Sequence, residues 1–216
     1  MNARANAAMQ RSDNAGPGTD IAAQVVSRIC HDLISPVGAI GNGVELLALS
    51  GKGEGPELDL IAESVARAQA RIRFFRIAFG EFSADRRINP AELRSIVDAL
   101  FLGTRIVMDW RMTADLSRRE AKLCFLLLLC LESALPRGGT ISAETMQDGG
   151  WVLRASADRL NVEHTLWEGL VSGHGAPPPL PKDVHFALAA RHGASIGARV
   201  AVEVTENTIC MVRSGA

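Results

Sequence analysis

The sequence predicts an α+β fold, in which an antiparallel helical hairpin precedes a domain of alternating helices and strands. Two long stretches of helical hydrophobic periodicity, at about 20–49 and 58–82, flank the glycine-rich turn at 50–57. After Ala84 the pattern changes to short elements of both types, which is typical of an α+β domain. The predicted organisation is a disordered tail (1–18), a helical hairpin (19–84) and an α+β domain (85–216).

The first helix is expected from about Asp20 to Leu49. Its apolar residues keep helical spacing on both sides of a proline: Ile21, Val25, Ile29, Leu33, Ile40, Val44 and Leu47. A proline inside a helix costs about 3 kcal/mol, and we expect a bend at Pro36 rather than an end because the periodicity continues. With about 100° per residue, His31 and Ser35 lie away from the apolar stripe that contains Leu33, Pro36 and Ile40.

The second helix has an apolar stripe of its own. Its members are Leu58, Ile61, Val65, Ala68, Ile72, Phe75, Phe79 and Phe82. A single hairpin cannot cover the apolar faces of both helices, so we expect two chains to form a dimeric four-helix bundle. If residue 49 lies opposite residue 57, residue 31 is level with residue 75, and Arg71, Arg73 and Arg76 lie near the height of His31.

Composition excludes several classes of protein. The formal net charge is −1, which argues against nucleic acid or an anionic membrane as a partner. The four cysteines have no metal-ligand spacing, so we expect reduced thiols and a cytoplasmic protein. The five histidines are scattered, which disfavours a metalloenzyme. The longest apolar run, 123–131, is about half of what a bilayer span needs.

The second domain is expected to alternate helices and strands. The pair Asn89 and Pro90 is an N-cap and first-turn signal for a helix that reaches about Leu102. The later expected elements are a strand at 105–110, a helix at 117–135, strands at 140–146 and 151–157, helices at 164–171 and 183–192, and strands at 195–204 and 208–213.

His31 is the strongest candidate for chemistry. A neutral imidazole is a good nucleophile near pH 7, and a phosphoryl group on its nitrogen can still be transferred. Asp32 would orient the ring or take its proton, and Ser35 would hydrogen-bond a phosphate oxygen or a water. Arginines near this height are candidates for binding an acidic partner: Arg28, Arg71, Arg73 and Arg76. The alternative for each arginine is an ordinary solvated helix face.

The string His31-Asp32-x-x-Ser35-Pro36 resembles the phosphoacceptor box of the dimerisation and histidine phosphotransfer domain of two-component histidine kinases. The second domain is similar to the ATP-binding (Bergerat) domain of those kinases, an α/β sandwich. This similarity rests on the helix at 123–135 with PRGGTI after it, and on VHFALAARHGASI at 184–196.

The nucleotide motifs of that domain are degenerate here. Cys130 stands where the family has its magnesium-binding asparagine. The first glycine box reads Asp158-Arg159-Leu160-Asn161, and PPPLPKD at 177–183 replaces the second. Glycines let backbone N–H groups approach phosphates, whereas prolines have no N–H to offer. The resemblance therefore implies a domain that binds neither the triphosphate nor its magnesium.

An intact phosphoacceptor hairpin on a degenerate ATPase-like domain resembles the ChpT-type histidine phosphotransferases of bacterial phosphorelays. The resemblance implies that a homodimer accepts phosphate on His31 from one receiver domain and passes it to another, with Asp32 assisting and magnesium supplied by the receiver. Gly38, Gly41 and Gly43 would then let a receiver helix approach closely, or would instead fit the second helix of the hairpin. The alternatives are an ATP-dependent histidine kinase with an unusual nucleotide site, and a non-catalytic scaffold that binds receivers.

Overall fold

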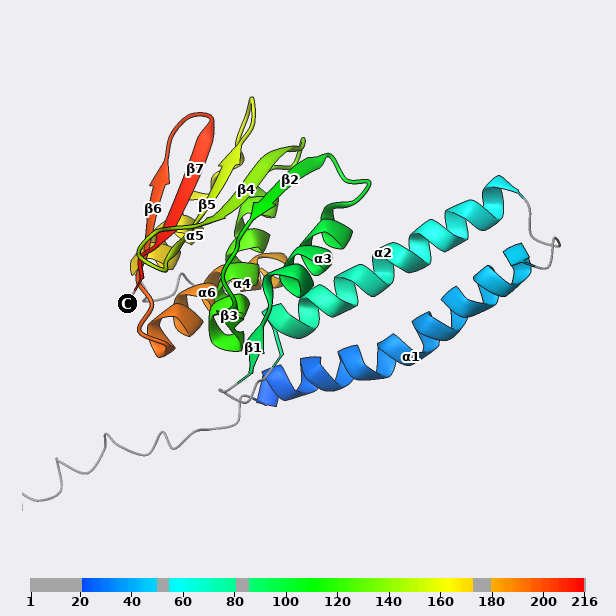
Figure 1. Ribbon diagram of the computed structural model, residues 1–216. Helices are drawn as coiled ribbons and strands as arrows, with labels where there is room; N and C mark the ends of the chain where they lie inside the picture. Colours follow the sequence, from blue (N-terminus) through cyan, green and yellow to red (C-terminus); the bar gives the residue numbers. More distant parts are fainter. Residues whose placement is uncertain (1–20, 50–54, 81–85, 173–179, 216) are drawn as a thin grey trace, which may run out of the picture.

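A helical hairpin lies beside a layer of helices that covers one face of a sheet (Figure 1). The computed structural model describes residues 21–49, 55–80, 86–172 and 180–215, with the backbone alone at 21–29, 31, 32, 35, 36, 57 and 181. The helices are α1 (Ile21–Leu49), α2 (Pro56–Ala78), α3 (Pro90–Phe101), α4 (Arg118–Ala134), α5 (His164–Ser172), the 3-10 turn η1 (Pro181–Asp183) and α6 (Val184–Ser195). The strands are β1 (Arg87–Ile88), β2 (Ile106–Arg111), β3 (Leu116–Ser117), β4 (Gly139–Thr145), β5 (Trp151–Ser156), β6 (Val200–Val204) and β7 (Thr208–Arg213).

The hairpin has the predicted antiparallel pairing. α1 continues as a helix through Pro36. Pairing residue 31 with 75 places residue 41 opposite 65, and a Cβ added to Gly41 would lie 3.3 Å from Cγ1 of Val65. The predicted tail at 1–18, the tip of the hairpin and Phe82 lie outside the described residues.

The apolar stripe of α1 is not covered by its own chain. Leu33, Ile40 and Leu47 are 45%, 54% and 48% exposed, and Ile61 of α2 is exposed as well. This exposure agrees with the expectation that a single hairpin cannot cover the apolar faces of both helices. The residues of α1 that face α2 are instead Cys30, which is buried, and Gly41.

The main sheet has the strand order β2-β4-β5-β7-β6. Only β2 and β4 pair in parallel, and the other neighbours are antiparallel. None of the described helices lies on the face of the sheet that points away from α4 (Figure 1). Charged side chains cover part of that face, where Arg111 pairs with Asp109 and both Arg111 and Arg154 reach Glu144.

α4 is the centre of the fold, because it lies between the sheet and α2 and is buried along most of its length. The ring of Phe74 on α2 stacks on Phe125 of α4, with centroids 4.5 Å apart. Phe74, Ile77 and Ala78 belong to the same hydrophobic cluster as the interior of the second domain. The predicted stripe of α2 missed this face, so α2 packs against the second domain as well as against α1.

Most predicted elements of the second domain are confirmed within a residue or two. Asn89 accepts the N–H of Glu92 at 2.9 Å and Pro90 begins α3, as expected. The predicted strand at 195–204 is wrong in its first half, because α6 continues to Ser195 and β6 begins only at Val200. The pair β1 and β3 was not predicted.

Replacing Phe74 with alanine should destabilise the whole chain. Its ring is fully buried against Phe125, and removing a buried aromatic side chain costs about 3 to 5 kcal/mol. Urea unfolding of Phe74→Ala measures the loss, with Leu102→Ala, at a highly exposed position, as the control that changes little. A loss below about 1 kcal/mol for Phe74→Ala would contradict this packing.

Candidate phosphotransfer site

Position 31 lies on the opposite side of the hairpin from the exposed apolar stripe. Cys30 and Gly41 mark the side of α1 that faces α2. Each residue adds about 100° around the helix axis. Position 31 is therefore turned to one side of the face with Cys30 and Gly41, whereas Leu33 and Ile40 are turned to the other side. The two functions that the sequence assigns to α1, dimerisation and phosphate acceptance, therefore fall on different faces.

α2 also has different neighbours on its different sides. Val65 and Gln69 face α1, while Ala70, Phe74 and Ile77 are buried toward the second domain. Arg73 lies between these two sets. On each helix, the side that faces the other helix is the reference direction. Because α1 and α2 run antiparallel, Arg73 on α2 and position 31 on α1 are turned from that reference toward the same side of the hairpin. This side, with position 31, Arg73 and Arg76, is called the acceptor face below.

Cys30 shows which basic residue lies at the height of position 31. It is 5% exposed, and burial raises the pKa of its thiol, an effect that the nearby guanidinium of Arg76 opposes. Arg76 is therefore close to the residue that precedes His31. This agrees with the predicted height of residue 31 opposite residue 75.

Two arginines of the second domain, Arg86 and Arg118, are joined through their backbones, and Arg118 feels the charge of Arg76 on α2. The backbone N–H of Arg118, the first residue of α4, donates to the carbonyl of Arg86 at 3.0 Å. Arg118 is only 9% exposed. Burial lowers the pKa of its guanidinium, repulsion from Arg86 and Arg76 lowers it further, and Glu92 acts in the opposite direction. Arg86 and Arg118 were not predicted as site residues, because they are distant from α2 in the sequence and only the tertiary fold brings the start of α4 toward it.

Lys122 fixes the end of α2 near this cluster. Its ammonium donates to the carbonyl of Gly80 at 2.9 Å and to that of Phe79 at 3.5 Å. A cation at the C-terminus of a helix satisfies free carbonyls and interacts favourably with the helix dipole. The N-terminal half of α4 thus holds the end of the helix that contains Arg76.

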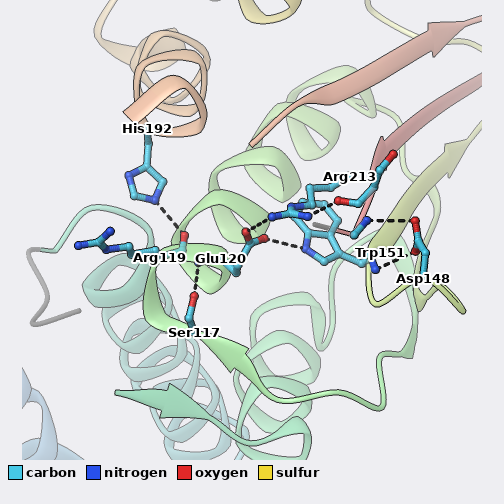
Figure 2. Close-up of polar contacts among 10 residues, drawn as sticks. Ser117, Arg119, Glu120, Asp148, Trp151, His192 and Arg213 are labelled. Atoms are coloured by element: carbon cyan, nitrogen blue, oxygen red, sulfur yellow. Dashed lines mark hydrogen bonds and ion pairs between the residues drawn. The ribbon is translucent and has the colours of Figure 1, made fainter. Parts of the chain in front are cut away.

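The N-terminus of α4 is itself held by three parts of the second domain (Figure 2). Glu120 accepts from Nη2 of Arg213 at 2.7 Å and from the indole N–H of Trp151 at 3.1 Å. Nε2 of His192 on α6 donates to the carbonyl of Arg119 at 2.9 Å. These contacts fix where α4 begins, and therefore where Arg118 lies relative to the hairpin.

The remaining predicted site residues have different surroundings. The guanidinium of Arg71 pairs with Glu132 of α4 at 2.9 Å, and its role in binding a partner stays a prediction. Arg73 and Arg76 are exposed, and neither has an ion pair with a carboxylate in the described ranges. A Cβ on Gly38 would meet nothing within 4 Å, whereas Gly41 is packed against α2.

Four predicted residues can be placed only by their position in a helix. Arg28, His31, Asp32 and Ser35 lie in α1, and their side chains are outside the described part of the structure. Their roles therefore stay predictions.

The residue at the expected magnesium position does not fit the metal. Cys130 is fully buried, and burial raises the pKa of its thiol well above the usual value, so it is a neutral core side chain. Magnesium instead requires oxygen ligands. A pocket of about 470 Å³ beside α4 and α6 is lined by apolar residues, and its only charged residue is Arg199. Among the described residues, no group of three or more His, Cys, Asp or Glu side chains could hold a metal ion.

Residues 90–208, more than half of the chain, match the family model of the histidine phosphotransferase C-terminal domain. The chain belongs to the histidine phosphotransferase family. The predicted two-component role is thereby confirmed.

Relatives agree with this assignment. The phosphotransferase is 35% identical over 171 residues to protein phosphotransferase ChpT of Brucella abortus (strain 2308), covering 77% of this chain and 80% of that protein. It is similar to a bacterial phosphotransferase solved at 1.7 Å, with a TM-score of 0.63, 28% identity and coverage of 87% and 92%. A histidine kinase domain from Erythrobacter litoralis EL346 is a looser match, with a TM-score of 0.45, 14% identity and coverage of 88% and 92%.

No helix in the described ranges of the phosphotransferase has the length and apolar character that spanning a membrane requires.

The stability of the phosphotransferase should fall as the pH drops below about 6.5. Burial lowers the pKa of both His192 and His185, so the folded state binds protons less readily than the unfolded state does. This stability is fully present above the unfolded pKa and is lost as the pH falls toward the folded value. Urea unfolding at two pH values on either side of about 6.5 measures the difference.

The variant His192→Gln should reduce this pH dependence, because glutamine can still donate to the carbonyl of Arg119 but does not titrate. His164→Gln, at an exposed position, is the matched control that keeps the native dependence. An unchanged pH dependence in His192→Gln would contradict the assignment.

Proposed function

We propose that this phosphotransferase moves a phosphoryl group between the aspartates of receiver domains through a phosphohistidine at His31. The observation that supports this most is the arrangement of the hairpin: position 31 shares the acceptor face with Arg73 and Arg76, and the exposed apolar stripe is on the opposite face. A receiver can therefore reach the acceptor face while the stripe is buried in a dimer.

The proposed reaction is a reversible exchange between an acyl phosphate and a phosphohistidine. A ring nitrogen of His31 donates its lone pair to phosphorus, and an N–P bond forms. The P–O bond to the receiver aspartate breaks, and the carboxylate leaves with the electron pair. The proton on the other ring nitrogen passes to Asp32 or to solvent. Transfer to the second receiver is the same exchange in reverse, and Ser35 would position a phosphate oxygen or a water.

No nucleotide takes part in the proposed reaction. The buried thiol of Cys130 offers no oxygen ligand for magnesium, and the pocket beside α4 is apolar apart from Arg199. We assign the magnesium ion to the receiver domain. Receivers of this kind are soluble signalling domains, so we place the phosphotransferase in the cytoplasm.

Phosphotransfer should depend on His31 and on a phosphorylated receiver. We expect label from a radiolabelled phospho-receiver to reach the native chain and the control His164→Ala, and to be lost completely in His31→Ala. Gel autoradiography after separate incubations with the phospho-receiver and with labelled ATP measures this.

Two results would contradict the proposal. Label that arrives from ATP in the absence of a receiver would show a histidine kinase. A bound receiver with no transfer of label to the native chain would show a scaffold.

The homodimer is proposed to form through the apolar stripe of the hairpin. A charge on this stripe should prevent the bundle, because a buried unpaired carboxylate is strongly unfavourable. We expect the double variant Leu33→Glu/Ile40→Glu to have half the native mass in light scattering coupled to gel filtration. Leu102→Glu, an equally apolar and more exposed position on the second domain, is the control that stays dimeric. A dimeric double variant, or a monomeric native chain, would exclude this interface.

A further inference from the structure

β6 is an edge strand of the main sheet, and its outer side is not paired. It bonds to β7, and none of the described strands lies on its other side (Figure 1). The N–H of Thr205 donates to the carbonyl of Thr208 at 2.9 Å, so these two residues form a hydrogen-bonded pair at the turn. Hydrogen-bonded pairs alternate along antiparallel strands, so the N–H and C=O groups of Val200, Val202 and Val204 point away from β7.

Two apolar pockets lie along this edge. The first, of about 470 Å³, is the pocket beside α4 and α6, and Val200 is part of its wall. The second, of about 380 Å³, lies between α5 and β6, and its wall includes Trp167, Val202 and Val204. Val171 of α5, which is 56% exposed, lines both pockets. Alternate side chains of a strand share one face and are about 7 Å apart, so one such set on an added strand would lie over the two pockets.

The second pocket has a rigid wall. Trp167 is 5% exposed, and its indole ring meets the ring of Phe186 on α6 edge to face, with centroids 5.3 Å apart. A wall that is already fixed needs little ordering when an occupant binds, which favours affinity.

The sequence of β6 lacks the usual protection of an edge strand. Natural edge strands are often blocked by prolines, bulges or charged side chains. β6 reads VAVEV, and its single charged residue, Glu203, alternates with the valines and therefore points to the other face of the sheet. At the opposite edge, the exposed side chains of β2 include Asp109 and Arg111, which pair at 3.1 Å. β6 is thus the edge that can accept another strand.

The two pockets have charges of opposite sign. Arg199 is the only charged residue in the wall of the first pocket. Glu168 is the only carboxylate in the wall of the second, where His164 is the only other titratable group. An occupant that matches these charges has an acidic residue near the Val200 end of β6 and a basic residue near the Val204 end.

We propose that β6 binds an extended segment of another protein, which adds an antiparallel strand to the sheet and places apolar side chains at alternate positions in the two pockets. Main-chain hydrogen bonds give such a complex its affinity, and the pockets give it specificity. β6 lies at the edge of the sheet far from the hairpin (Figure 1), so the inference does not depend on the proposed function. A partner bound there leaves the acceptor face open.

Two other occupants fit the site less well. Residues 1–20 of this chain contain no valine, isoleucine, leucine or aromatic residue, so they have little to place in apolar pockets. A second copy that paired β6 with β6 would fill neither pocket, because Val200, Val202 and Val204 of each copy already line the pockets of that copy.

The test titrates the peptide KVTVTVE into the nitrogen-15-labelled native protein. Its valines alternate, and its lysine and glutamate match Glu168 and Arg199 when the peptide runs antiparallel to β6. We expect the amide resonances of residues 200–204 to shift. The rearranged peptide KTVVVTE, whose valines point to both faces, should bind at least about fivefold more weakly. The peptide EVTVTVK, with the charges exchanged, should also bind more weakly.

Two variants test the edge and the pockets separately. Val202→Pro removes an outward N–H that makes no bond to β7, and an edge strand tolerates proline at such a position. Val171→Glu places a carboxylate between the two pockets. Each should weaken binding of KVTVTVE at least about fivefold. Val107→Glu, at a position on β2 that is 66% exposed, is the matched control that keeps native affinity. Thermal melting confirms that each variant is folded.

Three results would overturn the inference. The first is a native chain whose resonances at 200–204 do not respond to KVTVTVE, and the second is native affinity in the folded Val171→Glu variant. The third is a native tetramer that becomes a dimer in Val202→Pro, measured by light scattering, because it would assign the edge to a second copy of the chain.

Discussion

The packing of α2 against two partners at once is the constraint on which the rest of the structure depends. One side of α2 meets α1, where Val65 lies against Gly41, and another side meets α4, where Phe74 stacks on Phe125. The interior of the second domain therefore continues into the hairpin through Phe74, Ile77 and Ala78. As a consequence, the helix that contains His31 is held at a defined place relative to the second domain. A freely hinged pair of domains would not keep the ammonium of Lys122 on the carbonyls of Phe79 and Gly80.

This packing also leaves two different faces of the hairpin exposed, one for dimerisation and one for phosphate acceptance. With one side of α2 used for α1 and another for the second domain, two sides of the hairpin are left. The side with Leu33 and Ile40 is apolar and exposed, which favours a second copy of the chain. The other side has position 31 with Arg73 and Arg76, which are exposed, and this favours an anionic partner. Dimerisation and phosphotransfer can thus proceed together, because neither covers the surface that the other needs.

Helical periodicity was sufficient to predict the hairpin, its pairing and the position of His31, because these features depend on spacing along one or two neighbouring helices. It was not sufficient to predict what covers each face. Phe74 and Ile77 were missed because the period of a helix identifies its apolar sides, not their partners, and α2 has two such sides. The pairing of Arg71 with Glu132, and the meeting of Arg86 with Arg118, join residues distant in sequence. β1 and β3 are two residues long, so they have no periodicity to detect. The degenerate glycine boxes predict a site that does not bind a magnesium nucleotide, and this stays a prediction.

Native-state hydrogen exchange in a series of low denaturant concentrations tests most directly whether α2 belongs to both parts of the molecule. Amides of residues 71–78 in α2 and of residues 123–131 in α4 should open with the same free energy and the same dependence on denaturant, since they share one core. Exchange of α2 at a clearly lower free energy, with α4 still protected, would show a hairpin that unfolds by itself and would contradict the account.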